Sequence, residues 1–162
     1  WDDLNRLDGD GQPYDIKWDQ VEIFEPELDV WAISSYPFIF FPDPGAIPDD
    51  YYTPLLERTD KPLAVAEGGW TTQSVAGQER TPAMQLDYLR LLNQQIGDRL
   101  VFWINLTYGD LDWPAYQQVL GPDLGGDDLG TLSNFIYLGL VNKDGNPKPA
   151  LQYWDQLRSQ DR

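Results

Sequence analysis

The sequence contains neither cysteine nor histidine among its 162 residues. Without cysteine there is no disulfide framework and no thiolate chemistry. Without histidine, a Ser-His-Asp triad and a histidine-based zinc site are impossible within this chain. Acid–base chemistry must therefore come from carboxylates, tyrosine or lysine.

Basic residues are also scarce, since eleven Lys and Arg stand against 27 Asp and Glu, a formal net charge of −16. Such a field repels nucleic acid and anionic membranes, so neither is an expected partner. A neutral partner fits better than a polyanion, although an acidic surface also serves solubility alone. No apolar run approaches the ~20 residues of a membrane span, and the sequence shows no signal peptide.

Length and aromatic content set further bounds. A chain of 162 residues is long enough for one domain with its own core, but too short for a complete (β/α)8 barrel, which takes about 250 residues. Aromatic residues make up 14% of the chain, including seven Trp and nine Tyr. Their faces pack well against the C–H groups of sugars, but composition alone favours a tryptophan-rich core or interface.

Short apolar runs alternate with amphipathic helical segments, which is typical of a parallel α/β sheet. The pattern predicts a long loop over 107–132 and N-caps at Asp49 and Thr81. It predicts strands near 30–34, 63–67 and 100–106, and helices over about 18–24, 49–57, 82–96 and 149–157. Residues 8–12 resemble the start of a calcium loop but lack its later glycine and glutamate, so we expect an ordinary loop and no metal site.

Glu67 is the sharpest single feature of the sequence. It ends an otherwise apolar strand and precedes two glycines and Trp70. A carboxylate at the C-terminal end of a parallel strand lies where α/β folds bind ligands. The glycines allow a sharp turn and leave room for a ligand. The alternative is a strand-end glutamate paired with a lysine or arginine.

Three segments resemble strands 6, 7 and 8 of clan A (β/α)8 glycoside hydrolases of the endo-galactanase and cellulase kind. They are residues 29–38, 61–70 and 100–103, and the run 139–150 resembles the entry to the last barrel helix. The resemblance implies an α/β fold that is the C-terminal part of a TIM barrel, about strands 6–8. Residues 1–162 would then form a partial catalytic domain without strands 1–5.

The resemblance also implies a retaining double displacement, which uses two carboxyl groups about 5–5.5 Å apart and no cofactor. In that interpretation Glu67 is the nucleophile, Tyr36 donates a hydrogen bond to it, and Trp103 forms the floor of the −1 sugar subsite. Trp70 and Tyr108 line further subsites. The alternatives are a loop tyrosine packed on its neighbours and tryptophans in the core. We expect a neutral poly- or oligosaccharide as substrate and an extracellular or periplasmic location.

Two departures from the family pattern stand out. Ser34 occupies a position where many members carry histidine, and the Asn-Glu pair that supplies the acid/base residue is absent. Asp110 and Asp112 are the remaining candidates within the chain for the second carboxyl. The isolated chain is therefore expected to lack one of the two catalytic carboxyl groups. The sequence does not identify which glycosidic linkage is cleaved.

Three functional hypotheses follow. The chain is the C-terminal portion of a glycoside hydrolase, a non-catalytic carbohydrate-binding half-barrel, or a half-barrel that pairs with another. The open sheet edges would carry apolar side chains, namely Trp31, Ile33, Val101 and Ile104. Such edges are templates for association, so we expect either a bound polypeptide carrying strands 1–5 or self-association.

Overall fold

The computed structural model describes residues 1–2, 18–74, 77–120, 130 and 132–159. The run 8–12, where we expected an ordinary loop, lies outside these ranges. The helices are α2 (Trp18–Phe24), α3 (Thr53–Arg58), α4 (Pro82–Ile96), α5 (Trp113–Leu120) and α7 (Pro149–Arg158). The strands are β1 (Trp31–Ser35), β2 (Leu63–Gly68) and β3 (Leu100–Trp103). Short 3-10 helices are Glu25–Glu27, Pro37–Ile39, Pro44–Ala46 and Gly97–Arg99.

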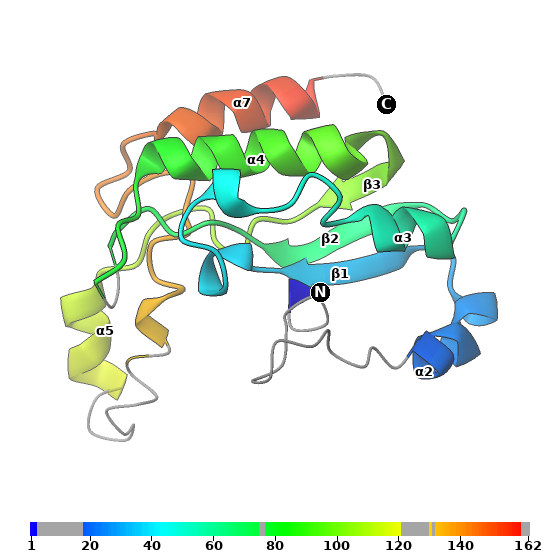
Figure 1. Ribbon diagram of the computed structural model, residues 1–162. Helices are drawn as coiled ribbons and strands as arrows, with labels where there is room; N and C mark the ends of the chain where they lie inside the picture. Colours follow the sequence, from blue (N-terminus) through cyan, green and yellow to red (C-terminus); the bar gives the residue numbers. More distant parts are fainter. Residues whose placement is uncertain (3–17, 75–76, 121–129, 131, 160–162) are drawn as a thin grey trace.

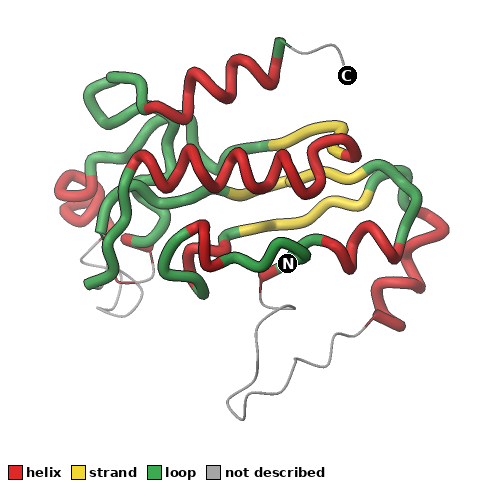
Figure 2. The backbone as a smooth tube through the Cα atoms, turned by 45° about the horizontal axis from the view of Figure 1, so that its top comes forward, coloured by secondary structure: helices red, strands yellow, loops and turns green. Residues whose placement is uncertain are grey.

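The three strands form one parallel sheet in the order β1-β2-β3, which confirms the predicted order and direction. Ile33 of β1 lies opposite Val65 of β2, and Val65 lies opposite Trp103 of β3. Parallel neighbours need crossover connections, which here contain α3 and α4. Helices α4 and α7 lie together on one side of the sheet (Figures 1 and 2). Within the described residues, β1 and β3 each have β2 as their only strand neighbour.

The hydrophobic core lies between the sheet and α4. Leu63 and Val65 of β2 are buried in it, together with Leu89 and Leu92 of α4. Leu89 and Leu92 recur at the spacing that places side chains on one helix face. Burying each such aliphatic side chain stabilises the fold by roughly 1.5–3 kcal/mol, so this stripe holds α4 on the sheet.

Helix starts were predicted with mixed success. The Thr81 hydroxyl accepts a hydrogen bond from the Met84 backbone N–H at 3.2 Å, which confirms the predicted cap of α4. The predicted Asp49 cap is wrong, because α3 begins at Thr53 and its N-cap residue, Tyr52, makes no side-chain cap. The preceding residues turn instead through backbone hydrogen bonds, such as the one from Thr53 N–H to the Asp50 carbonyl.

The region after β3 differs from expectation in two ways. Regular pairing of β3 ends at Trp103, although the backbone N–H groups of Ile104 and Leu106 still donate to β2 carbonyls at 2.9 and 2.8 Å. The predicted loop over 107–132 contains α5, whose first turn is capped by Asp112 accepting from Ala115 N–H at 3.3 Å.

Apolar side chains remain exposed along β3 and just beyond it. Val101, Phe102 and Ile104 are 57%, 44% and 49% exposed, whereas Trp31 on the opposite edge is buried. Trp31 therefore corrects the expectation of an exposed side chain at that edge, because it packs into the main core. None of the described helices is long and apolar enough to cross a membrane.

Candidate active site

Glu67 leaves the core because β2 carries an extra residue near its end. Leu63 and Val65 face the core beneath α4, and strict alternation would send Glu67 the same way. The register shifts so that Ser34 of β1 pairs with Glu67 rather than with Ala66. Such a bulge re-aims the side chains that follow it, and both Ala66 and Glu67 are exposed. The Glu67 carboxylate is therefore turned away from the helix-side core.

A cavity of about 360 Å³ lies beside Glu67 at the C-terminal ends of β1 and β2. Its walls combine aromatic or aliphatic side chains with hydroxyl groups and two carboxyl groups. They are Trp1, Asp2, Ser34, Tyr36, Ile39, Phe40 and Glu67. The cavity thus holds both residues predicted to act together, Glu67 and Tyr36.

Tyr36 follows directly after β1, and its ring packs edge-on against Phe135 with centroids 5.1 Å apart. Burial, followed by the negative charges of Glu67 and Asp2, raises the pKa of the Tyr36 phenol well above its usual value. The phenol therefore stays protonated and can donate a hydrogen bond at any physiological pH. Among the described residues no hydrogen bond joins Tyr36 to Glu67, so the structure brings the pair to one cavity without the predicted contact.

Asp2 is a residue of this cavity that sequence reasoning missed. Its carboxylate accepts hydrogen bonds from the Tyr51 hydroxyl at 2.8 Å, the Ser35 hydroxyl at 3.1 Å and the Tyr36 backbone N–H. Burial raises the pKa of the Asp2 carboxyl, and these donors partly oppose that rise. No local pattern marks Asp2, because the strand that it contacts lies more than thirty positions away.

The two glycines after Glu67 are required by close packing. A Cβ on Gly68 would lie 2.9 Å from the Ser35 carbonyl oxygen and 3.0 Å from a methyl carbon of Val65. Gly69 has a φ of +153°, and its N–H donates to the same Ser35 oxygen at 3.3 Å. The end of β2 is thereby held tightly against the end of β1, which sets the position of Glu67.

Trp70 and Trp103 do not join the cavity. Trp70 is fully buried, with its ring 5.7 Å from that of Tyr88 on α4, so it corrects the expectation of an accessible sugar platform. The Trp103 ring lies 5.2 Å from that of Trp154 on α7 and packs against the core. Its indole therefore packs on the helix side of the sheet, and Trp103 is not among the residues that line the Glu67 cavity. Tyr108, in contrast, is 66% exposed.

The in-chain candidates for a second catalytic carboxyl have other partners. Asp110 accepts from the Lys148 ammonium at 2.6 Å and from Gly139 N–H at 3.0 Å, and both charged side chains are almost completely buried. Asp112 caps α5. Neither residue lines the Glu67 cavity, so neither supplies a second carboxyl group beside Glu67 there. In the part of the chain that the structure describes, no cluster of acidic side chains could hold a metal ion.

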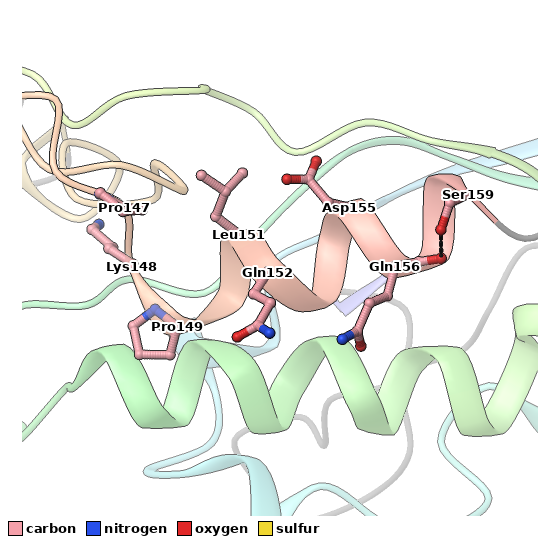
Figure 3. A pocket seen from close by; sticks show the side chains of 8 residues that line it. All are labelled: Pro147, Lys148, Pro149, Leu151, Gln152, Asp155, Gln156 and Ser159. Carbon is pink, nitrogen blue, oxygen red and sulfur yellow. Dashed lines mark hydrogen bonds between the residues drawn. The ribbon is translucent and has the colours of Figure 1, made fainter.

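A larger hollow of about 870 Å³ runs along α7 (Figure 3). Leu151, Gln152, Asp155 and Gln156 project from that helix into or beside it. It is an open groove along one helix and contains neither Glu67 nor Tyr36. Strand ends are where parallel α/β folds place their chemistry, so the smaller cavity at Glu67 is the candidate active site.

Comparison with protein-family models and with curated protein sequences gave no match. Among solved structures, the chain is similar to β-glucuronidases from Bifidobacterium dentium, in complex with coumarin-3-O-glucuronide, and from Lactobacillus rhamnosus. Their identities are 18% and 17%, their TM-scores 0.57 and 0.56, and they align with 83% and 85% of this chain. A Ruminococcus gnavus β-glucuronidase matches 84% of the chain at 12% identity and a TM-score of 0.54.

The chain spans between a fifth and a quarter of the length of these enzymes, at 21%, 24% and 23%. At such low identity the likeness shows the fold alone. The chain is an α/β protein whose parallel sheet and helices are similar to part of TIM-barrel glycosidases. The solved relatives are β-glucuronidases, so the narrower resemblance to galactanases and cellulases gains no support from them.

Proposed function

We propose that this chain carries the nucleophile side of a retaining glycoside hydrolase active site, with Glu67 as the nucleophile. One observation carries the proposal: the bulge in β2 turns an exposed carboxylate into a cavity that it shares with a protonated tyrosine. The competing explanation was a strand-end ion pair. Among the described residues Glu67 forms no such pair, whereas Glu22, Glu25 and Asp110 all do.

The chemistry requires one carboxylate from this chain and one carboxyl group from elsewhere. The Glu67 carboxylate attacks the anomeric carbon while the bond to the leaving oxygen breaks and a general acid protonates that oxygen. Water, deprotonated by the same second group, then releases the sugar and regenerates Glu67. Tyr36 stabilises the ionised nucleophile once a bound sugar draws the two side chains together, since hydrogen bonds favour the charged form.

A second polypeptide segment is proposed to supply the acid/base residue. Barrel closure requires a consistent number of strands, tilt and shear, and three strands cannot meet it. The exposed Val101 and Phe102 of β3, with Ile104 just after it, support a partner that extends the sheet at this edge. The alternative occupant is a second copy of this chain, which would bury the same surface without adding a catalytic carboxyl.

A neutral sugar is the proposed substrate class. The Bifidobacterium dentium relative was solved with a glucuronide, which carries a carboxylate. In this chain the cavity already holds Glu67 and Asp2, and none of its lining residues is lysine or arginine. A uronic acid would therefore meet two acidic side chains and, among the described lining residues, no basic side chain. An extracellular or periplasmic location remains a proposal alongside this substrate class.

Covalent trapping tests the proposal without needing the acid/base residue. We would incubate the intact protein with 2,4-dinitrophenyl 2-deoxy-2-fluoro-β-glycosides of glucose, galactose, mannose and xylose. Their leaving group departs without protonation, so the glycosyl-enzyme can form without the acid/base residue. It accumulates because the 2-fluorine and the absence of a general base slow its hydrolysis. Mass spectrometry should find the adduct on Glu67. Glu67→Gln should reduce labelling at least about a thousandfold. Thermal unfolding should change little, because the side chain is exposed and forms no hydrogen bond or ion pair with any of the described residues.

The matched control is Glu57→Gln, which changes an exposed carboxylate on α3 and should label like the wild type. Labelling at a residue other than Glu67, or equal labelling of Glu67→Gln, would overturn the assignment. The second candidate function is non-catalytic sugar binding, which the exposed Tyr108 ring near the strand ends favours. Saturable sugar binding that is lost in Tyr108→Ala, without any covalent adduct, would support that function instead.

A further inference from the structure

The catalytic proposal leaves one buried group of the cavity without a role. Asp2 is only 6% exposed, although acidic side chains are almost never buried unless they are paired or hydrogen-bonded. It has three hydrogen-bond donors, two on one oxygen and the third on the other. A carboxylate surrounded by donors in this way holds the groups that donate to it.

Two of the three donors of Asp2 belong to the segment at the end of β1 that positions the site. Tyr36 donates through its backbone N–H, and Ser35 through its hydroxyl, which also lies 2.7 Å from the Tyr52 hydroxyl. The Ser35 carbonyl in turn accepts from Gly69 N–H at 3.3 Å, two residues after Glu67. A continuous set of hydrogen bonds therefore runs from Asp2 through the end of β1 to the end of β2.

We propose that Asp2 is a positioning residue. It holds Tyr36 in the orientation from which the Tyr36 phenol donates a hydrogen bond to Glu67 when a sugar is bound. The proposal rests on the assignment of Glu67 as nucleophile. Asp2 acts through Tyr36 and does not touch the sugar. Both of its oxygens already accept hydrogen bonds, and its burial leaves little access for a leaving group or a water molecule. These features distinguish it from the missing acid/base residue.

A double-mutant cycle on Asp2 and Tyr36 tests this role in the intact protein. We would measure the limiting rate constant of inactivation and the half-saturating concentration with whichever of the four dinitrophenyl 2-fluoroglycosides labels the wild type fastest. Asp2→Ala should lower the limiting rate about 10–100-fold with little change in half-saturation, because misplacement by about 1 Å costs this much. Tyr36→Phe should give a similar loss. The double variant should be no slower than the slower single variant.

A conservative variant separates positioning from folding. Asp2→Asn retains an oxygen that can accept from Tyr36 N–H, so it should recover most of the rate that Asp2→Ala loses. Asp87→Asn is the control for charge, since Asp87 is exposed on α4 and forms an ion pair with the neighbouring Arg90. It should label like the wild type.

The outcomes separate this proposal from the assignment of Glu67. If the wild type is not labelled at Glu67, the assignment of the nucleophile fails, and the role of Asp2 fails with it. Two results with a labelled wild type would overturn only the role of Asp2. In the first, the rate losses of Asp2→Ala and Tyr36→Phe multiply in the double variant. In the second, Asp2→Ala is labelled at the normal rate. A loss in Asp2→Ala that appears equally in the Tyr36→Phe background would show a general effect on the fold.

Discussion

At the residue scale, the site depends on how closely two strand ends approach. Gly68 lies where any Cβ would meet the Ser35 carbonyl oxygen and a Val65 methyl carbon. Backbone on one side and a fully buried side chain on the other cannot move away freely. This contact distance is a direct consequence of pairing Ser35 with Gly68 across the bulged register.

We therefore expect Gly68→Ala to destabilise the fold by about 1–3 kcal/mol, the usual cost of overpacking. Chemical denaturation followed by tryptophan fluorescence measures this change. Gly130→Ala is the matched control, because no heavy atom of the described residues lies within 4 Å of a Cβ there. Its unfolding free energy should stay within about 0.5 kcal/mol of that of the wild type. Equal stability of the two variants would mean that the strand ends are further apart than described.

At the element scale, a buried ion pair joins the segment after β3 to the start of α7. The Lys148 ammonium contacts Asp110 at 2.6 Å and the Thr72 hydroxyl at 2.7 Å, and Asp110 also accepts from Gly139 N–H. Burial raises the pKa of the Asp110 carboxyl and lowers the pKa of the Lys148 ammonium, while each partner opposes the shift of the other. The pair therefore fastens α7 and the β2–α4 connection to the strand-end loops.

Removing one partner of this ion pair should lower the free energy of unfolding by more than the intact pair contributes to it. Lys148→Met leaves a buried carboxylate without its cation, which costs about 3–5 kcal/mol near neutral pH. The pKa of Asp110 should rise further in this variant, so the folded state binds a proton that the unfolded state has released. Stability then falls as pH rises from below the usual aspartate pKa through the raised value. The loss of unfolding free energy relative to the wild type, here called the deficit, should be small near pH 4 and large near pH 7.

Urea denaturation at both pH values measures this deficit for Lys148→Met against the wild type. The control is the double variant Lys148→Met with Asp110→Asn, which has no carboxyl group to titrate at this position. Its loss of unfolding free energy should therefore change less between the two pH values than that of Lys148→Met. A deficit of Lys148→Met that is equally large at pH 4 would contradict the ion-pair explanation and indicate lost packing.

At the scale of the whole molecule, the sheet has helices on one side and exposed apolar side chains along β3. Val101, Phe102 and Ile104 are each more than two-fifths exposed. An unpaired strand edge with apolar side chains is a template for another strand. The charge of −16 opposes association of like chains, so screening by salt should matter.

We expect the chain, when isolated at micromolar concentration in about 0.15 M salt, to self-associate rather than remain an 18.6 kDa monomer. Val101→Lys combined with Ile104→Lys should shift it toward the monomer, as measured by multi-angle light scattering. Ile23→Lys is the control, because Ile23 is 71% exposed on α2 and lies outside the sheet. A monodisperse wild-type monomer with cooperative unfolding would exclude the open-edge interpretation and favour a self-contained domain.

Local chemistry was enough to predict several features from the sequence. The parallel strands, the Thr81 cap and the position of Glu67 at a strand end depend on neighbours within a few positions along the chain. The charge balance and the absence of histidine restricted the possible chemistry to carboxylates, tyrosine and lysine. Asp49 was predicted wrongly from local chemistry. It is a residue type that caps helices well, but a backbone turn follows it and the helix begins four positions later.

Tertiary structure alone decided which side chains share a cavity. The bulge that turns Glu67 outward arises from pairing with β1, and a one-residue change of register reverses every side chain beyond it. Trp70 is buried against Tyr88 of α4, and the Trp103 ring packs against Trp154 of α7. The sequence had predicted that both tryptophans contact a sugar. Asp2 entered the site through hydrogen bonds to residues more than thirty positions away, because contacts of that range follow from the arrangement of strands in space and not from any local pattern.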